Sequence, residues 1–363
     1  MKFAGALPAK QEGRGVLTLT TSTGAHRGQP RATMREVAAL AGVSLKTVSR
    51  VINAEPGVSP ELATRVSAAI QRLDYRHNLW ASSLRRTDGK SATIGLILED
   101  IGNPFSATLH RAIEDVAVKR GVLVLAGSLE EDEARERELV SAFASRRVDG
   151  LVMMPASHDQ SYLLNERKAG TAIVFVDRPP AFLDADTVLT DNLGGARRGV
   201  QHLAAHGHQR IACLVDLQSI MTAALRHQGY REELEAQHLT YDPVLVRVDL
   251  RGIEQAEAAT MDLLARRPAP TAIFAAQNLL SIGAFRALRR LGLHHQVALV
   301  GFDDILLADL LDPGITVMAQ DPAAMGRTAA ELLFRRLDGD VTPTAHRIIP
   351  TRLIERGSGE IKP

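Results

Sequence analysis

The chain has 363 residues, 45% hydrophobic and 23% charged, a length and composition that indicate a globular protein of two or three domains. No run of about 18 apolar residues occurs, which argues against a membrane-spanning helix. The single cysteine, Cys213, excludes an intrachain disulfide and favours a reducing compartment such as the cytoplasm. The net charge of +1 conceals an asymmetry, because residues 1–90 hold 14 Lys and Arg against 6 Asp and Glu, and the remainder holds 29 against 36. A basic front segment favours a polyanionic partner such as nucleic acid.

Residues 1–30 are rich in Gly, Thr and Ser with scattered Arg, and this composition predicts a disordered extension. Residues 1–9 faintly resemble a secretory signal. Their apolar stretch is short, is broken by Pro8 and is followed at once by the charged residues 10–14. We therefore expect no signal peptide.

Residues 33–53 have the spacing of two short helices joined by a tight turn. Gly42 supplies the permissive turn residue, and Ser44 is placed to cap the second helix. The apolar residues predicted to face inward are Val37, Ala38, Ala41, Val48, Val51 and Ile52. This pattern predicts a helix-turn-helix.

The outward face of the second helix is short, polar and basic. It carries Leu45, Lys46, Ser49 and Arg50. A helix of this kind fits the major groove of DNA, where Arg or Lys can read guanine. An ordinary helical hairpin with a solvated basic face is the alternative for so short a pattern.

A third helix follows, capped by Ser59, opened by Pro60 and running to about Leu73, and its apolar residues complete a three-helix core. Residues 75–86 then form a short segment that Asn78 can cap. So short a helix is unstable alone in water and needs a partner in order to fold.

From these residues the sequence closely resembles the LacI/GalR family of bacterial transcriptional regulators, over about residues 31–357. The resemblance implies a hinge helix that carries Asn78, Ala81 and Leu84, with Leu84 wedged into the minor groove of an operator. A plain linker contact is the alternative role for Leu84. His77 stands where the family usually has proline, and Trp80 is bulkier than the residue that is common there.

The hypothesis for the DNA-binding region divides its residues by role. Arg50, Lys46 and Leu45 are expected to address bases. The residues expected to position the protein on phosphates are Ser44, Thr47, Ser49, Asn53 and Ser59.

From residue 92 onward, short β-rich runs alternate with helix-length stretches such as 103–120 and 131–147. The predicted strands are residues 93–98, 122–125, 148–154, 172–176, 187–190, 210–215, 272–275 and 297–300. Continuous apolar strands separated by helices predict parallel sheets covered on both faces, and two sheets fit this length better than one.

The resemblance implies that these sheets form two Rossmann-like subdomains of the periplasmic-binding-protein type, an α/β fold, with crossovers near residues 190 and 317. We expect a helix-turn-helix domain at 31–76, a hinge helix and linker at 77–91 and an effector-binding and dimerisation domain at 92–357. The expected N-subdomain spans about 92–189 and 317–340, and the expected C-subdomain spans about 190–316 and 341–357.

Open α/β sheets bind ligands at the carboxyl ends of their strands, so the residues that follow each strand are candidates for a ligand site. Carboxylates, amides and an aromatic ring gather there and suit a polyhydroxylated ligand. The candidates are Phe105, Ser106, Asp177, Arg178, Asp191, Gln277 and Asp303. Asp and Asn after strands are also ordinary helix caps, and this alternative stays open for Asp191 and Asp304. Phe105 and Asp303 match family positions that line the effector pocket.

Two family expectations fail in this region. The usual arginine in the helix before Gly229 aligns with Ala224, Arg226 being out of register, and the usual asparagine after Ala276 is Gln277. The absence of that arginine weakens the expectation of a standard hexose effector and favours considering a different effector.

The sequence gives no support for catalysis. It has no Walker phosphate loop, and His202 and His206 lack the glutamate of a zinc-protease motif, so we expect neither a metal nor a cofactor. The expected function is a cytoplasmic homodimeric repressor that binds double-stranded operator DNA and a sugar or related metabolite. A solute-binding protein of a transport system is the alternative for the body alone, disfavoured by the DNA-binding head and the missing signal peptide. The sequence does not decide whether the effector is an inducer or a corepressor, or whether the protein is a dimer or a tetramer.

Overall fold

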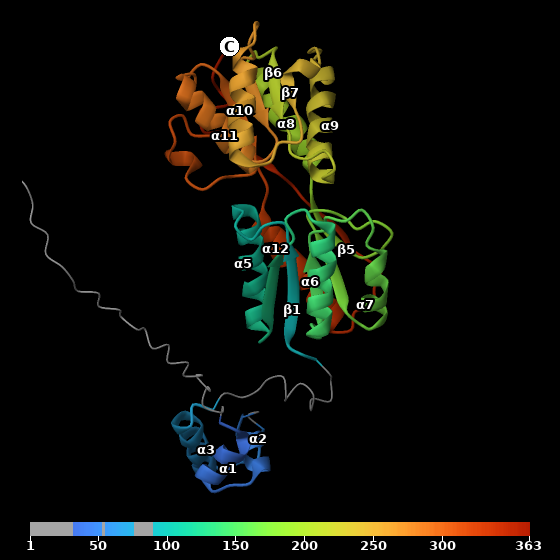
Figure 1. The fold of residues 1–363 in the computed structure, drawn as a ribbon, viewed down its shortest axis with the longest axis vertical. Coiled ribbons are helices and arrows are strands. Elements are labelled where there is room, and N and C mark those ends of the chain that lie inside the picture. The colour runs from blue at the N-terminus through green and yellow to red at the C-terminus, as the bar shows by residue number, and fades with distance from the viewer. Residues whose placement is uncertain (1–31, 53–54, 76–89) are drawn as a thin grey trace, which may run out of the picture. The chain divides into compact units, whose positions relative to one another are not determined.

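The computed structural model describes residues 32–52, 55–75 and 90–363 (Figure 1). They fall in two compact units, one within Met1–Leu79 and one within Trp80–Pro363. We call the described part of the first the head and that of the second the body. Asn53, Asn78, Ala81 and Leu84 lie outside the described residues. In the described ranges, no helix has the length and apolar character needed to cross a membrane.

The head contains the helices α1 (Met34–Ala41), α2 (Leu45–Ile52) and α3 (Pro60–Arg72). Its core is small and apolar, and the fully buried side chains Val37, Val48 and Val66 come one from each helix. Each helix alone is too short to be stable in water, so packing around this core holds the three together. The predicted inward faces of the first two helices are confirmed, with Val51 and Ile52 partly buried against the core.

Local signals fix the helix ends of the head. Gly42 adopts the left-handed conformation (φ 63°) that ends α1. The Ser44 hydroxyl accepts the Thr47 amide at 3.1 Å and caps α2, and the Ser59 hydroxyl accepts the Leu62 amide at 3.3 Å and caps α3. The predicted turn and caps are confirmed.

The body contains two six-stranded sheets. The first has the order β11-β5-β4-β3-β1-β2, and all its strand pairs are parallel. Its strands are β1 (Thr93–Leu98), β2 (Leu123–Ser128), β3 (Gly150–Met153), β4 (Ala172–Val176), β5 (Asp186–Thr190) and β11 (His346–Ile349).

The second sheet has the order β12-β10-β9-β8-β6-β7, parallel except for the antiparallel pair β10–β12. Its strands are β6 (Ile211–Leu214), β7 (Val246–Arg247), β8 (Ala272–Ala275), β9 (Ala298–Phe302), β10 (Thr316–Ala319) and β12 (Arg352–Ile354). The central strands of both sheets are continuously buried, as the unbroken apolar runs predict.

Helices cover both faces of each sheet (Figure 1). On the first sheet, α5 (Pro104–Lys119) and α12 (Pro322–Leu337) pack on one face and α6 (Glu133–Ser145) on the other, where the buried Leu163 leads into the short α7 (Leu164–Lys168). On the second sheet, α8 (Asn192–Ala205) and α9 (Met221–Ala236) face α10 (Gly252–Ala265) and α11 (Asn278–Leu291) across the strands. The expected α/β fold of two Rossmann-like subdomains is confirmed.

The expected crossover near residue 190 agrees with the passage from β5 to α8, but the later expectation was wrong in detail. Residues 316–319 form β10 of the second sheet, so the return to the first subdomain comes at α12. Residues 346–349 form β11 beside β5, so a third crossing lies between β11 and β12. The edge strands β11 and β12 are short and partly exposed, and their sequences carry little of the apolar pattern that predicts a strand.

Candidate functional site

The exposed face of α2 is the candidate DNA-reading surface of the head. Leu45 is 44% exposed although it is apolar, and Lys46 next to it is also exposed. The Arg50 guanidinium lies 3.7 Å from the Glu55 carboxylate, and both side chains are more than 40% exposed. An exposed pair of this kind contributes little to stability, so Arg50 can exchange Glu55 for another acceptor.

Three of the expected phosphate-positioning residues carry structural duties as well. Besides capping α2, the Ser44 hydroxyl lies 2.9 Å from the Thr47 hydroxyl, and the Ser59 hydroxyl caps α3. Hydroxyls and amides at helix N-termini are also the groups that bind phosphate oxygens. The capping geometry is therefore compatible with both roles.

The body holds a second candidate site, a cavity in the cleft between the two sheets, which we call the cleft cavity. Most of its polar residues follow the carboxyl ends of strands β1, β4, β6, β8, β9 and β10, as open α/β sheets predict, and Thr222 and Arg226 come from α9. The lining residues are Glu99, Asn103, Phe105, Met154, Asp177, Arg178, Asp216, Ile220, Thr222, Ala223, Arg226, Ala276, Gln277, Asn278, Asp303 and Gln320. Its volume is about 40 Å³, well below the roughly 300–1,000 Å³ of typical ligand pockets. A ligand of sugar size therefore requires the cleft to open.

Arg226 is the most heavily connected cation in this cavity. Its guanidinium donates to Asn192 Oδ1 at 2.8 Å and to the Ala276 carbonyl at 2.9 Å, and lies 3.5 Å from the Asp303 carboxylate. It also stacks over the Phe302 ring at 3.9 Å. The side chain is 6% exposed, so these partners replace the water that the charge has lost.

Asp303 and Asp177 both adopt left-handed backbone conformations, with φ of 70° and 69°. Asp tolerates this region better than most residues do. Asp303 Oδ1 accepts the Gln320 amide at 2.6 Å. Asn278 Nδ2 donates to Asn103 Oδ1 at 2.8 Å, and this bond links the two subdomains across the cleft.

Arg178 is held by the carboxylate of Glu131. Two hydrogen bonds of 2.8 and 2.6 Å join the pair, and the Pro155 carbonyl accepts a third at 3.2 Å. The Asp177 carboxylate lies 3.6 Å away. Bidentate arginine–carboxylate pairs are strong and directional, so this pair forms a fixed wall of the cavity.

Several carboxylates in the cleft resist ionisation. Burial, reinforced by the negative charge of Glu131, raises the pKa of Glu99 to about 7. Burial also raises the pKa values of Asp177 and Asp216, against the opposing effects of Arg178 on Asp177 and of the Leu217 amide on Asp216. Such shifts are typical of functional clefts.

The structure places five predicted effector residues in the lining of the cleft cavity: Phe105, Asp177, Arg178, Gln277 and Asp303. It does not bring the other two there. Asp191 accepts the Gly194 amide at 2.9 Å as the cap of α8 and lies 3.3 Å from Arg198. Ser106 is buried within α5. Asp304 pairs with Arg356 at 2.7 Å, outside the cavity lining.

The expectation that the cavity lacks its arginine was wrong. α9 begins at Met221, so residues 222, 223 and 226 share one helical face and all line the cavity. Glu99, Asp216 and Gln320 were also missed. Each lies just past the end of a strand, the same signal that identified Asp177 and Asp303.

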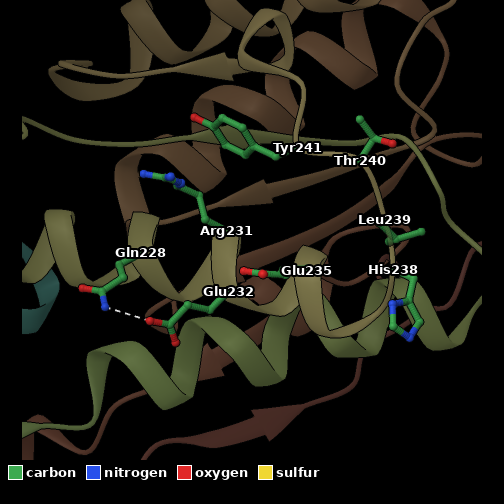
Figure 2. Close-up of a pocket in the computed structure, with 8 residues that line it drawn as sticks. All are labelled: Gln228, Arg231, Glu232, Glu235, His238, Leu239, Thr240 and Tyr241. Atoms are coloured by element: carbon green, nitrogen blue, oxygen red, sulfur yellow. Dashed lines mark hydrogen bonds between the residues drawn. The ribbon is translucent and has the colours of Figure 1, made fainter.

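A larger groove lies elsewhere on the body, along α9 and residues 238–241 (Figure 2). It has a volume of about 720 Å³ and is open to solvent. In it Gln228 Nε2 donates to Glu232 at 2.8 Å, and Arg231 lies 5.1 Å from the centre of the Tyr241 ring. The groove involves one subdomain alone, so a ligand there would not bridge the cleft.

Comparison with known protein families gives two matches. Residues 33–78 match the family described as bacterial regulatory proteins, lacI family. Residues 200–359 match the family described as periplasmic binding protein-like domain.

Two known proteins match this chain over nearly the whole of their own length. The HTH-type transcriptional regulator CelR of Thermobifida fusca is 34% identical over 340 residues, 91% of this chain and 98% of CelR. The ribose operon repressor of Escherichia coli K12 is 31% identical over 334 residues, 90% of this chain and 99% of the repressor.

Solved structures agree with these matches. A complex of the regulator CelR with cellobiose superposes with a TM-score of 0.66 at 33% identity and covers 90% of this chain and 100% of that one. The lac repressor dimer bound to operator and an anti-inducer superposes with a TM-score of 0.79 at 27% identity and covers 91% and 99%.

Proposed function

The chain belongs to the LacI family of bacterial regulatory proteins and is a DNA-binding transcriptional regulator rather than an enzyme, and we propose that it acts as a homodimeric repressor controlled by a small molecule in the cleft cavity. One observation carries the proposal. The same chain joins a head with an exposed basic reading helix to a body whose strand ends converge on a polar cleft.

For DNA binding, we assign base contacts to Leu45, Lys46 and Arg50 on α2. The residues assigned to phosphates are Ser44, Thr47, Ser49, Asn53 and Ser59. The exposure of Leu45 and Lys46 supports this division. Asn78, Ala81 and Leu84 are assigned to a hinge helix within residues 77–91, which joins the head at 31–76 to the body.

For dimerisation, exposed apolar side chains on both subdomains support a face that a second copy covers. Val118 on α5 and Leu123 on the edge strand β2 are 65% and 60% exposed. Leu306 and Leu310, after β9, are 81% and 73% exposed. An apolar face covered by a second copy would account for this exposure, and a dimer presents two heads to a two-fold operator.

For control, a ligand that opens or closes the cleft changes the relative pose of the subdomains and so the spacing of two heads. A sugar or related metabolite suits the carboxylates and amides of the cavity. The ligand weakens operator affinity if it is an inducer and strengthens it if it is a corepressor. Because the target is chromosomal DNA, we place the protein in the cytoplasm.

The test is a gel-shift titration of the full chain with DNA that flanks its own gene, at several salt concentrations. The account predicts a retarded complex with two chains per DNA and an affinity that falls steeply with salt, because phosphate contacts release counterions. Light scattering on the free protein checks the dimer. Absence of retardation at low salt would overturn the proposal.

A further inference from the structure

The cleft cavity and its wall contain more carboxylates than cations. Glu99, Asp177, Asp216 and Asp303 line the cavity, and Glu131 forms part of its wall through Arg178. Arg178 and Arg226 are the cations that line it. Among the described residues the acidic groups of the cavity and its wall therefore outnumber the cations, which disfavours an anionic ligand such as a sugar acid or a sugar phosphate.

Both arginines are already engaged by protein acceptors. Arg178 is held by Glu131, and Arg226 by Asn192, the Ala276 carbonyl and Asp303. Neither forms an ion pair with the two remaining acids, Glu99 and Asp216. Among the described residues these two acids have no cation within ion-pair distance, and a cationic ligand would supply one.

Glu99 and Asp216 reach the cavity from opposite subdomains, after β1 and β6 respectively. In the described chain, no hydrogen bond or ion pair reaches the Glu99 carboxylate. The Asp216 carboxylate accepts only the amide of its neighbour Leu217, at 2.7 Å. The charge of Asp216 raises the free energy of ionising Glu99, so the two carboxyls lie within electrostatic reach of each other.

Two further buried polar atoms in the lining lack partners. Gln320 is 8% exposed, and its Oε1 has no donor. Its Nε2 donates to Asp303, which fixes the amide so that Oε1 is the atom left without a partner. Arg178 Nε is a buried donor that makes no hydrogen bond, its nearest carboxylate being Asp177 at 3.6 Å. A buried polar group without a hydrogen bond costs free energy of folding, so these atoms indicate where a ligand forms hydrogen bonds.

From this set of groups we propose that the effector is a polyhydroxylated molecule with a protonated amine, such as an amino sugar or an amino polyol, whose ammonium lies between Glu99 and Asp216. Its hydroxyls donate a hydrogen bond to Gln320 Oε1 and accept one from Arg178 Nε. The proposal rests on the proposed function, because it names the ligand class of the same cavity. Among the described residues there is no group of three metal-ligating side chains, which favours an organic cation over a metal ion.

The raised pKa of Glu99 supports this assignment. Burial and the neighbouring acids Glu131, Asp216 and Asp177 disfavour its charged form, and Arg178 opposes them only in part. An ammonium beside the carboxylate would reverse that penalty. A neutral sugar would leave the carboxylate desolvated and without a cation.

The experiment is a thermal-shift and calorimetric comparison of matched ligands on the full chain. The probes are D-glucosamine, D-glucose and D-glucuronate, and the corresponding amine, neutral and acid forms of galactose and of sorbitol. In at least one series we expect the amine to bind on the order of tenfold more tightly than its hydroxyl counterpart, and the acid not to bind.

Glu99→Gln and, separately, Asp216→Asn should bring the amine-to-neutral affinity ratio close to one. Glu235→Gln removes a carboxylate from the exposed part of α9, outside the cavity, and should keep the full ratio. The melting temperature without ligand shows that each variant is folded.

A neutral or acidic form that binds as tightly as its amine overturns the assignment. So does an amine preference that survives both cavity variants, or a set of amines none of which raises the melting temperature. Operator binding is scored separately in the gel shift. A neutral sugar that releases the operator would leave the proposed function standing while the amine proposal falls.

Discussion

The head keeps its functional charges in water, whereas the body keeps them out of it. Arg50 and Glu55 on the head are 42% and 48% exposed, while Arg226 and Asp303 in the cleft are 6% and 9% exposed. A solvated pair can exchange partners at little cost, which suits a surface that has to bind and leave DNA. A buried network cannot, which suits a cavity that has to distinguish one ligand from another.

The largest expected effect that tests this contrast between solvated and buried charges is at Arg226. Because Arg226→Ala leaves Asp303 buried without its cation, we expect the body to lose about 3–5 kcal/mol of unfolding free energy, measured by urea denaturation. Arg231→Ala, on the exposed side of the same helix over Tyr241, should cost less than about 1 kcal/mol. Equal losses for the two variants would contradict the contrast between solvated and buried charges.

A second test uses pH. The folded-state pKa of Glu99 lies above its unfolded value of 4.5, at about 7, so the fold loses stability as pH rises from about 4.5 to about 7, and the loss levels off above that. Burial causes most of this shift, the charges of Glu131, Asp216 and Asp177 add to it, and Arg178 opposes it. Glu99→Gln removes the penalty and should be more stable than wild type at pH 8, by up to about 3 kcal/mol, with the gain vanishing near pH 4.5. A gain that does not depend on pH would show that Glu99 is not the titrating group.

A third test concerns Arg50. Arg50→Ala should cost about 1–3 kcal/mol of operator binding and relax discrimination at one base position. Anisotropy titrations against operators substituted at each position measure both effects. Arg231→Ala carries the same loss of charge on the body and should bind every operator like wild type. An equal loss on all operators for Arg50→Ala would remove its base-reading role.

The smallest expected effect is at Ser59, where two roles overlap. Ser59→Ala removes the cap of α3 and should cost the head about 1 kcal/mol of stability. Ser59→Asp keeps a capping oxygen but places a negative charge where a phosphate is expected, so it should hold the head's stability and weaken all operators alike. Wild-type operator binding by the Asp variant would leave Ser59 with its capping role alone.

The head could be predicted closely because its signals are local. Gly42, Ser44, Ser59 and Pro60 act on residues within one turn of themselves, so their spacing fixes the helix ends. The central strands of the body were found for a similar reason, since unbroken apolar runs such as 172–176 report burial directly.

The cleft depends on distant residues and was predicted only in part. Strand ends pointed to Asp177 and Asp303, but Asp191 follows the same pattern and is a helix cap. Arg226 was missed because its place in the cavity depends on where α9 begins, which no local pattern near it fixes. The edge strands β7, β11 and β12 were missed because they are short, and the inner strand β10 was missed because residue 317 was taken for a crossover.

The most direct test of the central claim is a linkage experiment with a ligand identified by thermal shift. The measurement is the dissociation constant of the operator with and without ligand, and that of the ligand with and without operator. The account predicts the same factor in both. For Asp303→Asn the account predicts that the ligand changes operator affinity by a factor near one. Asn is chosen because it tolerates the left-handed backbone at this position. A ligand that binds the cleft and leaves operator affinity unchanged would contradict the account.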